Sequence, residues 1–434
     1  MIWEKKSVSA IVCRILMALV ILCGMSEEGM TANYDESKVP EYALPEILKS
    51  QDGEIIDTPE KWQCKRRPEI LRLFETHVYG RQPKASPMAA YEQILYTPDA
   101  LNGLATLREI KITFPEKKKS PEIYLLLWTP NKGNTPYPAF IGLNFSGNQA
   151  THPDPRIRLS TQWMRPSRGG DVKENQALES SRGATSTRWP VEMIIKRGYA
   201  LATIYCGDID PDFDDGFKNG VHAMFPGFGT KDGARLPDAW GTISGWSWGL
   251  SRAMDYFEGD GSIDHSRVAV FGHSRLGKTA LWAGATDRRF AMVISNNSGC
   301  GGAALNRRAF GETVQRINTS FPHWFNDKFL EYNSNENAIP VDQHMLIGLI
   351  APRPVYVASA EEDRWADPKG EWLSLKHAAP VYKLLGKDPL DLATQPEVDK
   401  PEHKDTGYHI RRGKHDINSF DWAQYLNFAD QHLK

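Results

Sequence analysis

The stretch VAVFGHSRLGKTALWAGA, residues 268–285, runs from a β-branched strand through a glycine and a serine into a helix-forming segment. Gly272 and Gly277 stand on either side of Ser274. Small neighbours permit the tight, strained strand-to-helix turn called a nucleophile elbow, which exposes the serine Oγ. A serine that only caps a helix would use the same kind of turn. The motif alone therefore leaves two interpretations of Ser274, a nucleophile or a helix cap.

The segments on either side of this stretch alternate between strand-like and helix-like patterns. Apolar strand candidates lie at 122–130, 139–146, 200–206, 267–272, 291–298 and 353–360. Helix-forming segments lie between them at 191–198, 248–260 and 276–286. Near-continuous apolar strands are typical of a parallel sheet that is buried on both faces. The alternation predicts an α/β fold, a three-layer αβα sandwich with a doubly wound, mostly parallel sheet, in one domain of residues 33–434.

Composition and charge limit the kinds of molecule that the protein is expected to bind. The 434 residues are 41% hydrophobic and carry a formal net charge of −2, which is ordinary globular usage. No long basic run is present, so we expect no binding to the polyanionic backbone of a nucleic acid. Nucleic acid is therefore not an expected partner.

The N-terminus has the layout of a signal peptide. Lys5, Lys6 and Arg14 precede or open an apolar run that ends near Cys23 and is too short to span a bilayer stably. Residues 1–32 are therefore predicted to be a signal peptide, and the protein is predicted to be secreted or periplasmic, with no membrane attachment after cleavage. A lipoprotein site needs a small residue before the cysteine, and Leu22 is not small, so a lipid anchor is less favoured.

Three cysteines follow the predicted signal peptide: Cys64, Cys206 and Cys300. An odd number allows at most one disulfide within the chain. No disulfide framework is expected.

Two later segments supply an acid and a base that could act with Ser274. The segment RPVYVASAEEDRWADPKGEW (353–372) ends a strand near residue 360 and places Glu361, Glu362, Asp363 and Asp367 just beyond it. A serine, then an acid after a late strand, then a histidine is the order of a catalytic triad in α/β-hydrolases.

The histidine of such a triad would come from YHIRRGKHDINSFDW (408–422), which places His415 on a loop after a short strand. His409 is the local competitor, but it lies within the strand pattern and is expected to be packed in the core. A buried carboxylate would fix the tautomer of His415 and stabilise the imidazolium that forms when Ser274 loses its proton.

An acyl-transfer site also needs hydrogen-bond donors for the oxyanion. The backbone amide of Arg275 and an amide from the loop 144–149 fit the usual places, and the Arg275 guanidinium could add charge. Lys278, one helical turn beyond Ser274, could reach a substrate hydroxyl. The alternative for Lys278 is a solvated surface lysine.

Two long connections, about 150–190 and 207–247, interrupt the alternation. Loops this long usually carry function or are disordered. The second holds Phe225, Phe228 and Trp240, with Trp246 and Trp248 at its end, and these rings could either stack on sugars or pack in the core. The run DIDPDFDDG (208–216) fails the pattern of a calcium loop, so it is interpreted as a solvated acidic loop.

The residues around Ser274 resemble a known family. GHSRLGK is similar to the nucleophile signature of bacterial glucuronoyl esterases, carbohydrate esterase family 15 in the α/β-hydrolase superfamily. The similarity extends to 62–80, 295–313, 317–325, the segment EDRWADPKGEW and the GKHD loop. Members cleave the ester between 4-O-methyl-glucuronic acid on xylan and lignin alcohols, without metal or cofactor.

The resemblance implies roles for individual residues. Ser274 would be the nucleophile, His415 the base and Arg275 the oxyanion partner. Three further positions would bind the glucuronate ring: Lys278, Glu312 and Trp365. The implied partner is a glucuronoxylan or lignin–carbohydrate ester substrate, and the chain is expected to act as a monomer.

The chain departs from many family members at the catalytic acid. Those members place a glutamate where this chain has Asn297, and an amide cannot stabilise an imidazolium as a carboxylate does. Asp363, at the position that some bacterial members use, would then supply the charge. Fungal members also join two cysteines at the positions of His273 and Asp416, so that disulfide is absent here.

Two other functions remain open at this point. An acetylxylan esterase or another carbohydrate esterase would use the same triad. The lost glutamate would also suit a catalytically weak, glycan-binding protein on a hydrolase scaffold, because fold alone does not fix function.

Overall fold

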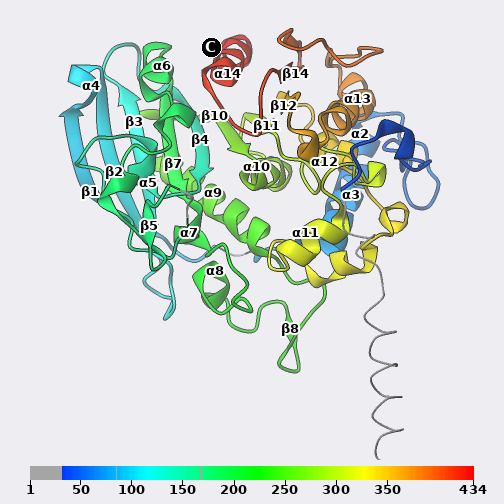
Figure 1. The fold of residues 1–434 in the computed structure, drawn as a ribbon, viewed down its shortest axis with the longest axis horizontal. Coiled ribbons are helices and arrows are strands. Elements are labelled where there is room, and N and C mark those ends of the chain that lie inside the picture. Colours follow the sequence, from blue (N-terminus) through cyan, green and yellow to red (C-terminus); the bar gives the residue numbers. More distant parts are fainter. Residues whose placement is uncertain (1–31, 85, 167–168) are drawn as a thin grey trace, which may run out of the picture.

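The centre of the molecule is a ten-stranded mixed sheet in the order β1-β2-β3-β7-β4-β10-β11-β12-β14-β13 (Figure 1). The computed structural model describes residues 32–84, 86–166 and 169–434. The expected signal peptide lies outside these residues except for its last position. No helix within the described ranges is both long and apolar enough to cross a membrane.

Six neighbouring strands run parallel: β7 (Ala200–Tyr205), β4 (Tyr137–Asn144), β10 (Ile263–His273), β11 (Met292–Asn296), β12 (Val355–Ala360) and β14 (Thr406–Arg411). The doubly wound, mostly parallel sheet predicted from the sequence is confirmed. The segment 122–130 forms β3 (Ile123–Pro130), but β3 runs antiparallel to β7. All eight residues of β3 are buried, so its apolar pattern predicts a covered strand and not its direction.

The sequence pattern did not predict the strands of the antiparallel part of the sheet. This part contains β1 (Ala90–Asp99), β2 (Ala105–Thr113) and, at the other edge, β13 (Glu402–His403). Residues 90–94 of β1 are all exposed on both faces, so the strand lacks the apolar pattern that marks the buried strands.

Helices cover both faces of the sheet and make three layers. The longer ones are α3 (Arg67–Phe74), α9 (Thr242–Gly259), α10 (Arg275–Thr286), α13 (Pro368–Leu384) and α14 (Ser419–Leu433). The shorter ones include α2 (Pro59–Lys61), α4 (Ala100–Gly103), α5 (Asn148–Thr151), α6 (Val191–Lys196), α7 (Cys206–Ile209), α8 (Gly220–Ala223), α11 (Val314–Ser320) and α12 (Gln343–Gly348).

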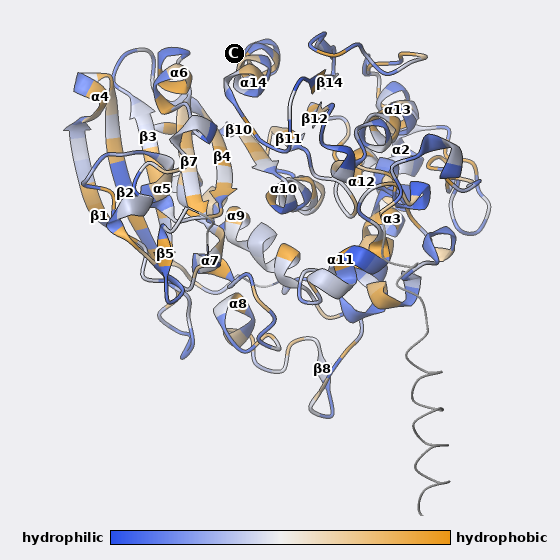
Figure 2. Ribbon diagram, viewed as in Figure 1, coloured by the Kyte–Doolittle hydropathy of each residue, from blue (hydrophilic) through white to orange (hydrophobic). Residues whose placement is uncertain are grey.

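The buried strands contribute alternate side chains to two separate hydrophobic clusters, one on each face of the sheet. In β10, Val268 and Val270 join the larger cluster with α9 and α10, whereas Ala269 and Phe271 join the smaller one with α6 and α14. Side chains of a strand point to opposite faces in turn, so a strand that is apolar throughout must be covered twice. Figure 2 shows the orange apolar strands of this sheet between the helical layers.

The described parts of the two long connections contain short helices and hairpins. The first contains the hairpin of β5 (Val172–Lys173) and β6 (Gln176–Ala177), and the second contains α7, α8 and the hairpin of β8 (Thr230–Lys231) and β9 (Ala234–Arg235). Trp240, Trp246 and Trp248 are buried, so the core-packing interpretation is correct for the tryptophans.

The first part of the acidic run 208–216 is buried and is not the solvated loop that the sequence suggested, whereas Asp214 is exposed as expected. Asp208, Asp210 and Asp212 are each at most 4% exposed. Polar partners inside the fold explain the burial, because Asp210 accepts a hydrogen bond from Thr242 and Asp212 has several partners at the site described below.

Candidate active site

Ser274 lies between β10 and α10 in a strained backbone conformation, with φ 58° and ψ −131°. Its side chain makes no capping hydrogen bond to α10, so the helix-cap interpretation is wrong. A Cβ at position 272 would lie 1.9 Å from the Leu276 carbonyl oxygen, so only glycine fits beneath the turn. This geometry is that of a nucleophile elbow.

Asp363 and His415 meet beside this elbow. His415 Nδ1 lies 2.6 Å from Asp363 Oδ2, and the Asp363 side chain is 3% exposed while that of His415 is 40% exposed. Asp363 follows β12, and His415 follows β14, its parallel neighbour, so the carboxyl ends of adjacent strands bring the two residues together. The neighbouring acids Glu361 and Glu362 are exposed.

His415 also packs against the residue before the nucleophile. Its ring centroid lies 4.5 Å from that of His273. Ser274 Oγ makes no hydrogen bond to any residue in the described ranges, and such contacts often tighten only when substrate binds.

His273 is a buried neutral imidazole. Burial and the neighbouring His415 lower its pKa well below the ordinary value, and its Nδ1 lies 2.6 Å from Asn296 Oδ1. Because His273 stays uncharged, it adds no positive charge beside the ring that would accept a proton.

Asn297 also contacts the Asp363 carboxylate. Its Nδ2 donates to Asp363 Oδ2 at 2.7 Å, the same oxygen that faces His415. Asn297 has a left-handed backbone, with φ 47°, directly after β11. The amide at this position therefore supports the late-strand carboxylate and does not replace it.

Arg275 is held against Asp212, a residue that the sequence did not single out. Its guanidinium lies 2.9 Å from Asp212 Oδ2, and it stacks over the Phe145 ring at 4.5 Å and the Trp324 ring at 5.6 Å. Phe145 belongs to the predicted loop 144–149. The acidic run 208–216 is visible in the sequence, but its pattern does not distinguish a buried aspartate from a solvated one.

Asp212 stays ionised despite its burial. Desolvation favours the neutral acid, but the charge of Arg275 and hydrogen bonds from His323 and Trp324 hold the pKa of Asp212 below its ordinary value. Trp324 Nε1 donates to Asp212 Oδ1 at 2.8 Å. The Arg275–Asp212 pair is therefore a fixed charged unit next to Ser274.

Lys278 is buried, so the surface-lysine alternative is wrong. Its Nζ donates to the carbonyls of Ser298 and Cys300, both at 2.6 Å, and to Glu312 Oε2 at 3.1 Å. Trp365 lies next to Glu312, because the backbone carbonyl of Trp365 accepts a hydrogen bond from the Glu312 N–H at 2.9 Å. The three residues expected to bind substrate therefore form one connected cluster.

Glu371 is a further buried acid at the site, and no signal in the sequence pointed to its role. Its carboxylate accepts the N–H groups of Ser298 and Gly299, at 2.7 and 3.1 Å, and the Ser359 hydroxyl at 2.6 Å. Burial raises its pKa to about 8. It therefore holds the backbone of the loop that carries Asn297 and the Lys278 acceptors.

The remaining candidates have structural partners. His409 is fully buried, with Nε2 2.9 Å from Asp421 Oδ1 and Nδ1 3.0 Å from the Tyr356 hydroxyl, as expected for a packed histidine. Asp367 pairs with Arg308 at 2.8 Å. Neither residue contacts Ser274 or His415.

Comparisons with known proteins agree with this geometry. A family model described as glucuronyl esterase of fungi matches residues 236–386. A curated relative, carbohydrate esterase MZ0003 from an unknown prokaryotic organism, is 49% identical over 407 residues, covering 92% of each chain.

Two solved structures are also similar. A promiscuous esterase of carbohydrate esterase family 15 from a marine bacterial metagenome is 49% identical, with a TM-score of 0.87 over 93% of this chain and 100% of that one. A glucuronoyl esterase from Solibacter usitatus is 44% identical, with a TM-score of 0.85 over 92% of this chain and 100% of that one. The chain therefore belongs to carbohydrate esterase family 15, the family of the glucuronoyl esterases.

Proposed function

We propose that the protein is a serine esterase that hydrolyses the ester between 4-O-methyl-glucuronic acid of glucuronoxylan and a lignin alcohol. The observation that carries the proposal is the 2.6 Å contact between His415 and the buried Asp363, beside a serine in a strained elbow. The relative from Solibacter usitatus, described as a glucuronoyl esterase, supports the choice of substrate.

The reaction would proceed through an acyl-enzyme. Ser274 Oγ attacks the ester carbonyl while His415 Nε2 takes its proton, and Asp363 stabilises the imidazolium that results. The bond to the alcohol oxygen then breaks, and His415 returns the proton to the leaving alcohol. A water molecule, activated by His415, attacks the acyl-enzyme and releases the free glucuronic acid.

Arg275 would stabilise the oxyanion. Arg275 is the first residue of α10, so its backbone N–H is free of the helix ladder. Its guanidinium is already oriented by Asp212 and by the rings of Phe145 and Trp324. Donors that are fixed before the reaction need no reorganisation as charge develops on the carbonyl oxygen.

The cluster around Lys278 would bind the glucuronate ring. The Lys278 ammonium donates its hydrogen bonds to Ser298, Cys300 and Glu312, so it would act mainly by orienting Glu312. The Glu312 carboxylate would accept sugar hydroxyls, and the indole of Trp365 would pack against the ring.

A second candidate is a wider ester specificity that includes acetylated carbohydrates. The observation that favours it is the description of the marine metagenome relative as promiscuous. The same triad would serve both kinds of ester, and only the selection of substrate would differ.

The experiment that tests the function compares benzyl glucuronate, acetylated xylan and an aryl acetate as substrates of the wild type and Ser274→Ala. We expect a preference for the glucuronate, with loss of hydrolysis in the variant. A preference for acetate esters would overturn the substrate assignment. Absence of all hydrolysis would favour the glycan-binding alternative.

We also propose that residues 33–434 form one exported catalytic domain acting as a monomer, with residues 1–32 removed as a signal peptide. The layout of charges and apolar residues in 1–32 supports export. Sequencing the N-terminus of the protein from a bacterial periplasm or culture medium tests the cleavage.

A further inference from the structure

Two adjoining cavities lie between the 115–122 turn and the 207–240 connection. The first has a volume of about 490 Å³ and the second about 650 Å³. They share Lys119, Lys218 and Ala223 as lining residues, so they form one continuous groove. None of the residues assigned above to catalysis or to the glucuronate ring lines it.

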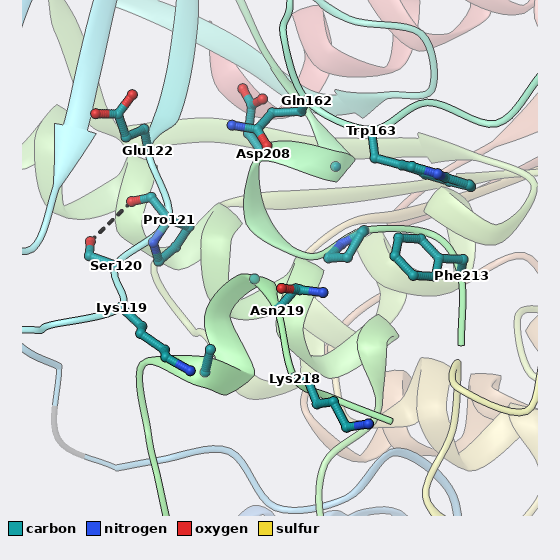
Figure 3. Close-up of a pocket in the computed structure, with 14 residues that line it drawn as sticks. Lys119, Ser120, Pro121, Glu122, Gln162, Trp163, Asp208, Phe213, Lys218 and Asn219 are labelled. Atoms are coloured by element: carbon teal, nitrogen blue, oxygen red, sulfur yellow. Dashed lines mark hydrogen bonds between the residues drawn. The ribbon is translucent and has the colours of Figure 1, made fainter. Parts of the chain in front are cut away.

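One end of this groove adjoins the proposed active site. Pro211 and Phe213 line the first cavity and flank Asp212, the residue that pairs with Arg275 at 2.9 Å. Phe213 packs against Trp163, with ring centroids 4.5 Å apart. Both rings are partly exposed, and Figure 3 shows them together on the side of the cavity opposite Lys119 and Ser120.

The groove has polar groups as well as rings. Gln162 and Asn219 line the first cavity, and Phe225 and Phe228 line the second. Aromatic faces beside amide side chains suit a saccharide, whose rings have apolar faces and hydroxyl edges.

The charges of the groove are mainly positive. Lys117, Lys118, Lys119 and Lys218 line it, and none of them forms an ion pair with any residue in the described ranges. Lys117 additionally lies 5.3 Å from the centroid of the Phe225 ring.

The acidic lining residues offset little of this charge. Glu122 pairs with Lys111 at 2.5 Å, and burial raises the pKa of Asp208 well above its ordinary value. Glu116 is the remaining acid that lines the groove. Arg235 also lines the second cavity, stacked 3.5 Å above the Phe217 ring.

We infer that this groove binds an acidic saccharide chain, namely the uronate-bearing polysaccharide on either side of the ester under attack. Free uronate carboxylates would pair with the lysines, and sugar rings would pack on Trp163 and Phe213. The inference rests on the proposed function, because that function supplies a polymer with both an ester and free uronates. Lignin is a poorer fit, since a largely neutral aromatic polymer has few anionic groups to pair with the four lysines.

The test separates the groove from the catalytic site. The variant Lys119→Glu/Lys218→Glu reverses two charges in the groove. The control Lys132→Glu/Lys400→Glu reverses two exposed lysines that also lack ion pairs with described residues and that line neither cavity. Each protein is assayed on benzyl glucuronate and on an esterified xylo-oligosaccharide that carries a further free glucuronate.

We expect kcat/KM on benzyl glucuronate to be unchanged in both variants. On the acidic oligosaccharide, kcat/KM of the groove variant should fall about tenfold through a higher KM, because two attractive lysine–carboxylate contacts become repulsive. The wild-type KM should rise between about 50 and 300 mM salt, and that of the groove variant should not. Equal KM values for the groove and control variants would overturn the inference.

Binding measured without turnover separates this inference from the proposed function. Calorimetry with Ser274→Ala and a de-esterified, uronate-bearing xylo-oligosaccharide should give binding that is lost on adding Lys119→Glu/Lys218→Glu. Binding that is unaffected by the groove substitutions would contradict the inference, whether or not the enzyme hydrolyses glucuronate esters.

Discussion

Asp363 Oδ2 faces two nitrogen atoms, His415 Nδ1 at 2.6 Å and Asn297 Nδ2 at 2.7 Å. Asn297 therefore fixes the carboxylate in the orientation that the histidine needs. Asn297 Oδ1 is buried and accepts no hydrogen bond from the described residues, so among them the side-chain amide contacts Asp363 alone. The residue acts through Asp363 and is a positioning residue.

Replacing Asn297 by alanine should lower kcat on benzyl glucuronate by about tenfold, because one hydrogen bond to a charged group contributes about 1.5–3 kcal/mol and only part of it acts on the reaction. KM should change little. Steady-state kinetics with a thermal-unfolding control measure the effect. An unchanged kcat would show that Asp363 needs no support from this side.

Glu371 should make stability depend on pH. Its pKa is raised by burial from 4.5 to about 8, so between these values the folded state holds a proton that the unfolded state has released. Stability should then fall as pH rises across this window, by up to about 1.4 kcal/mol per pH unit. Above pH 8 both states are ionised and the dependence ends.

Glu371→Gln should flatten this profile, because glutamine imitates the protonated acid and can still accept from Ser298 and Gly299. Urea unfolding at several pH values from 5 to 8 measures it, with the exposed Glu361→Gln as the control. A profile for Glu371→Gln as steep as that of the wild type would assign the dependence to other groups.

At the scale of elements, the elbow between β10 and α10 determines whether the serine is exposed. A Cβ added at Gly272 would lie 1.9 Å from the Leu276 carbonyl oxygen and 2.7 Å from the Gly277 nitrogen. Backbone atoms of the same turn cannot move away without opening it. The turn therefore requires glycine at this position for steric reasons.

Gly272→Ala should destabilise the protein by more than about 2 kcal/mol and abolish hydrolysis, because the clash is with backbone. Gly259→Ala is the matched control: outside its own helix turn, no atom of the described residues lies within 4 Å of the added Cβ, so the substitution should be neutral or slightly stabilising. Denaturant unfolding of both variants measures the difference. A stable, active Gly272→Ala enzyme would contradict the described turn.

The elbow and the elements after it could be predicted because their signals are local. Glycines at 272 and 277, a strand that ends near 360 and a loop after 413 are each visible in short stretches. The direction of β3 and the presence of β1 were not predictable in this way. Strand direction depends on pairing between distant segments, and most of β1 has no buried face.

At the scale of the whole molecule, the supporting residues of the site come from distant parts of the chain. Asp212 reaches Arg275 across 63 positions of sequence, and Glu371 reaches Ser298 across 73. The triad candidates could be predicted from the sequence, because the order serine, acid, histidine along the chain is itself a signal. The residues that support them could not be predicted, because a buried aspartate in 208–216 has the same local pattern as a solvated one.

The fold should not depend on disulfides. The cysteines in the described residues, Cys64, Cys206 and Cys300, are all free, and burial raises the pKa of the Cys206 and Cys300 thiols. The Tm of a chain beginning at residue 33 should therefore be the same with and without dithiothreitol. A lower Tm under reduction would reveal a stabilising disulfide and contradict the free thiols.

The central claim is that Asp363 is the acid of the catalytic triad and stabilises the imidazolium of His415, while Asn297 only positions Asp363. The direct test is hydrolysis of benzyl glucuronate by Asp363→Asn beside the wild type, with circular dichroism to verify the fold. We predict a fall in kcat of about 10³–10⁴-fold with little change in KM, because an amide neither selects the right tautomer of His415 nor stabilises its charge. A folded Asp363→Asn enzyme that keeps most of its activity would contradict the account.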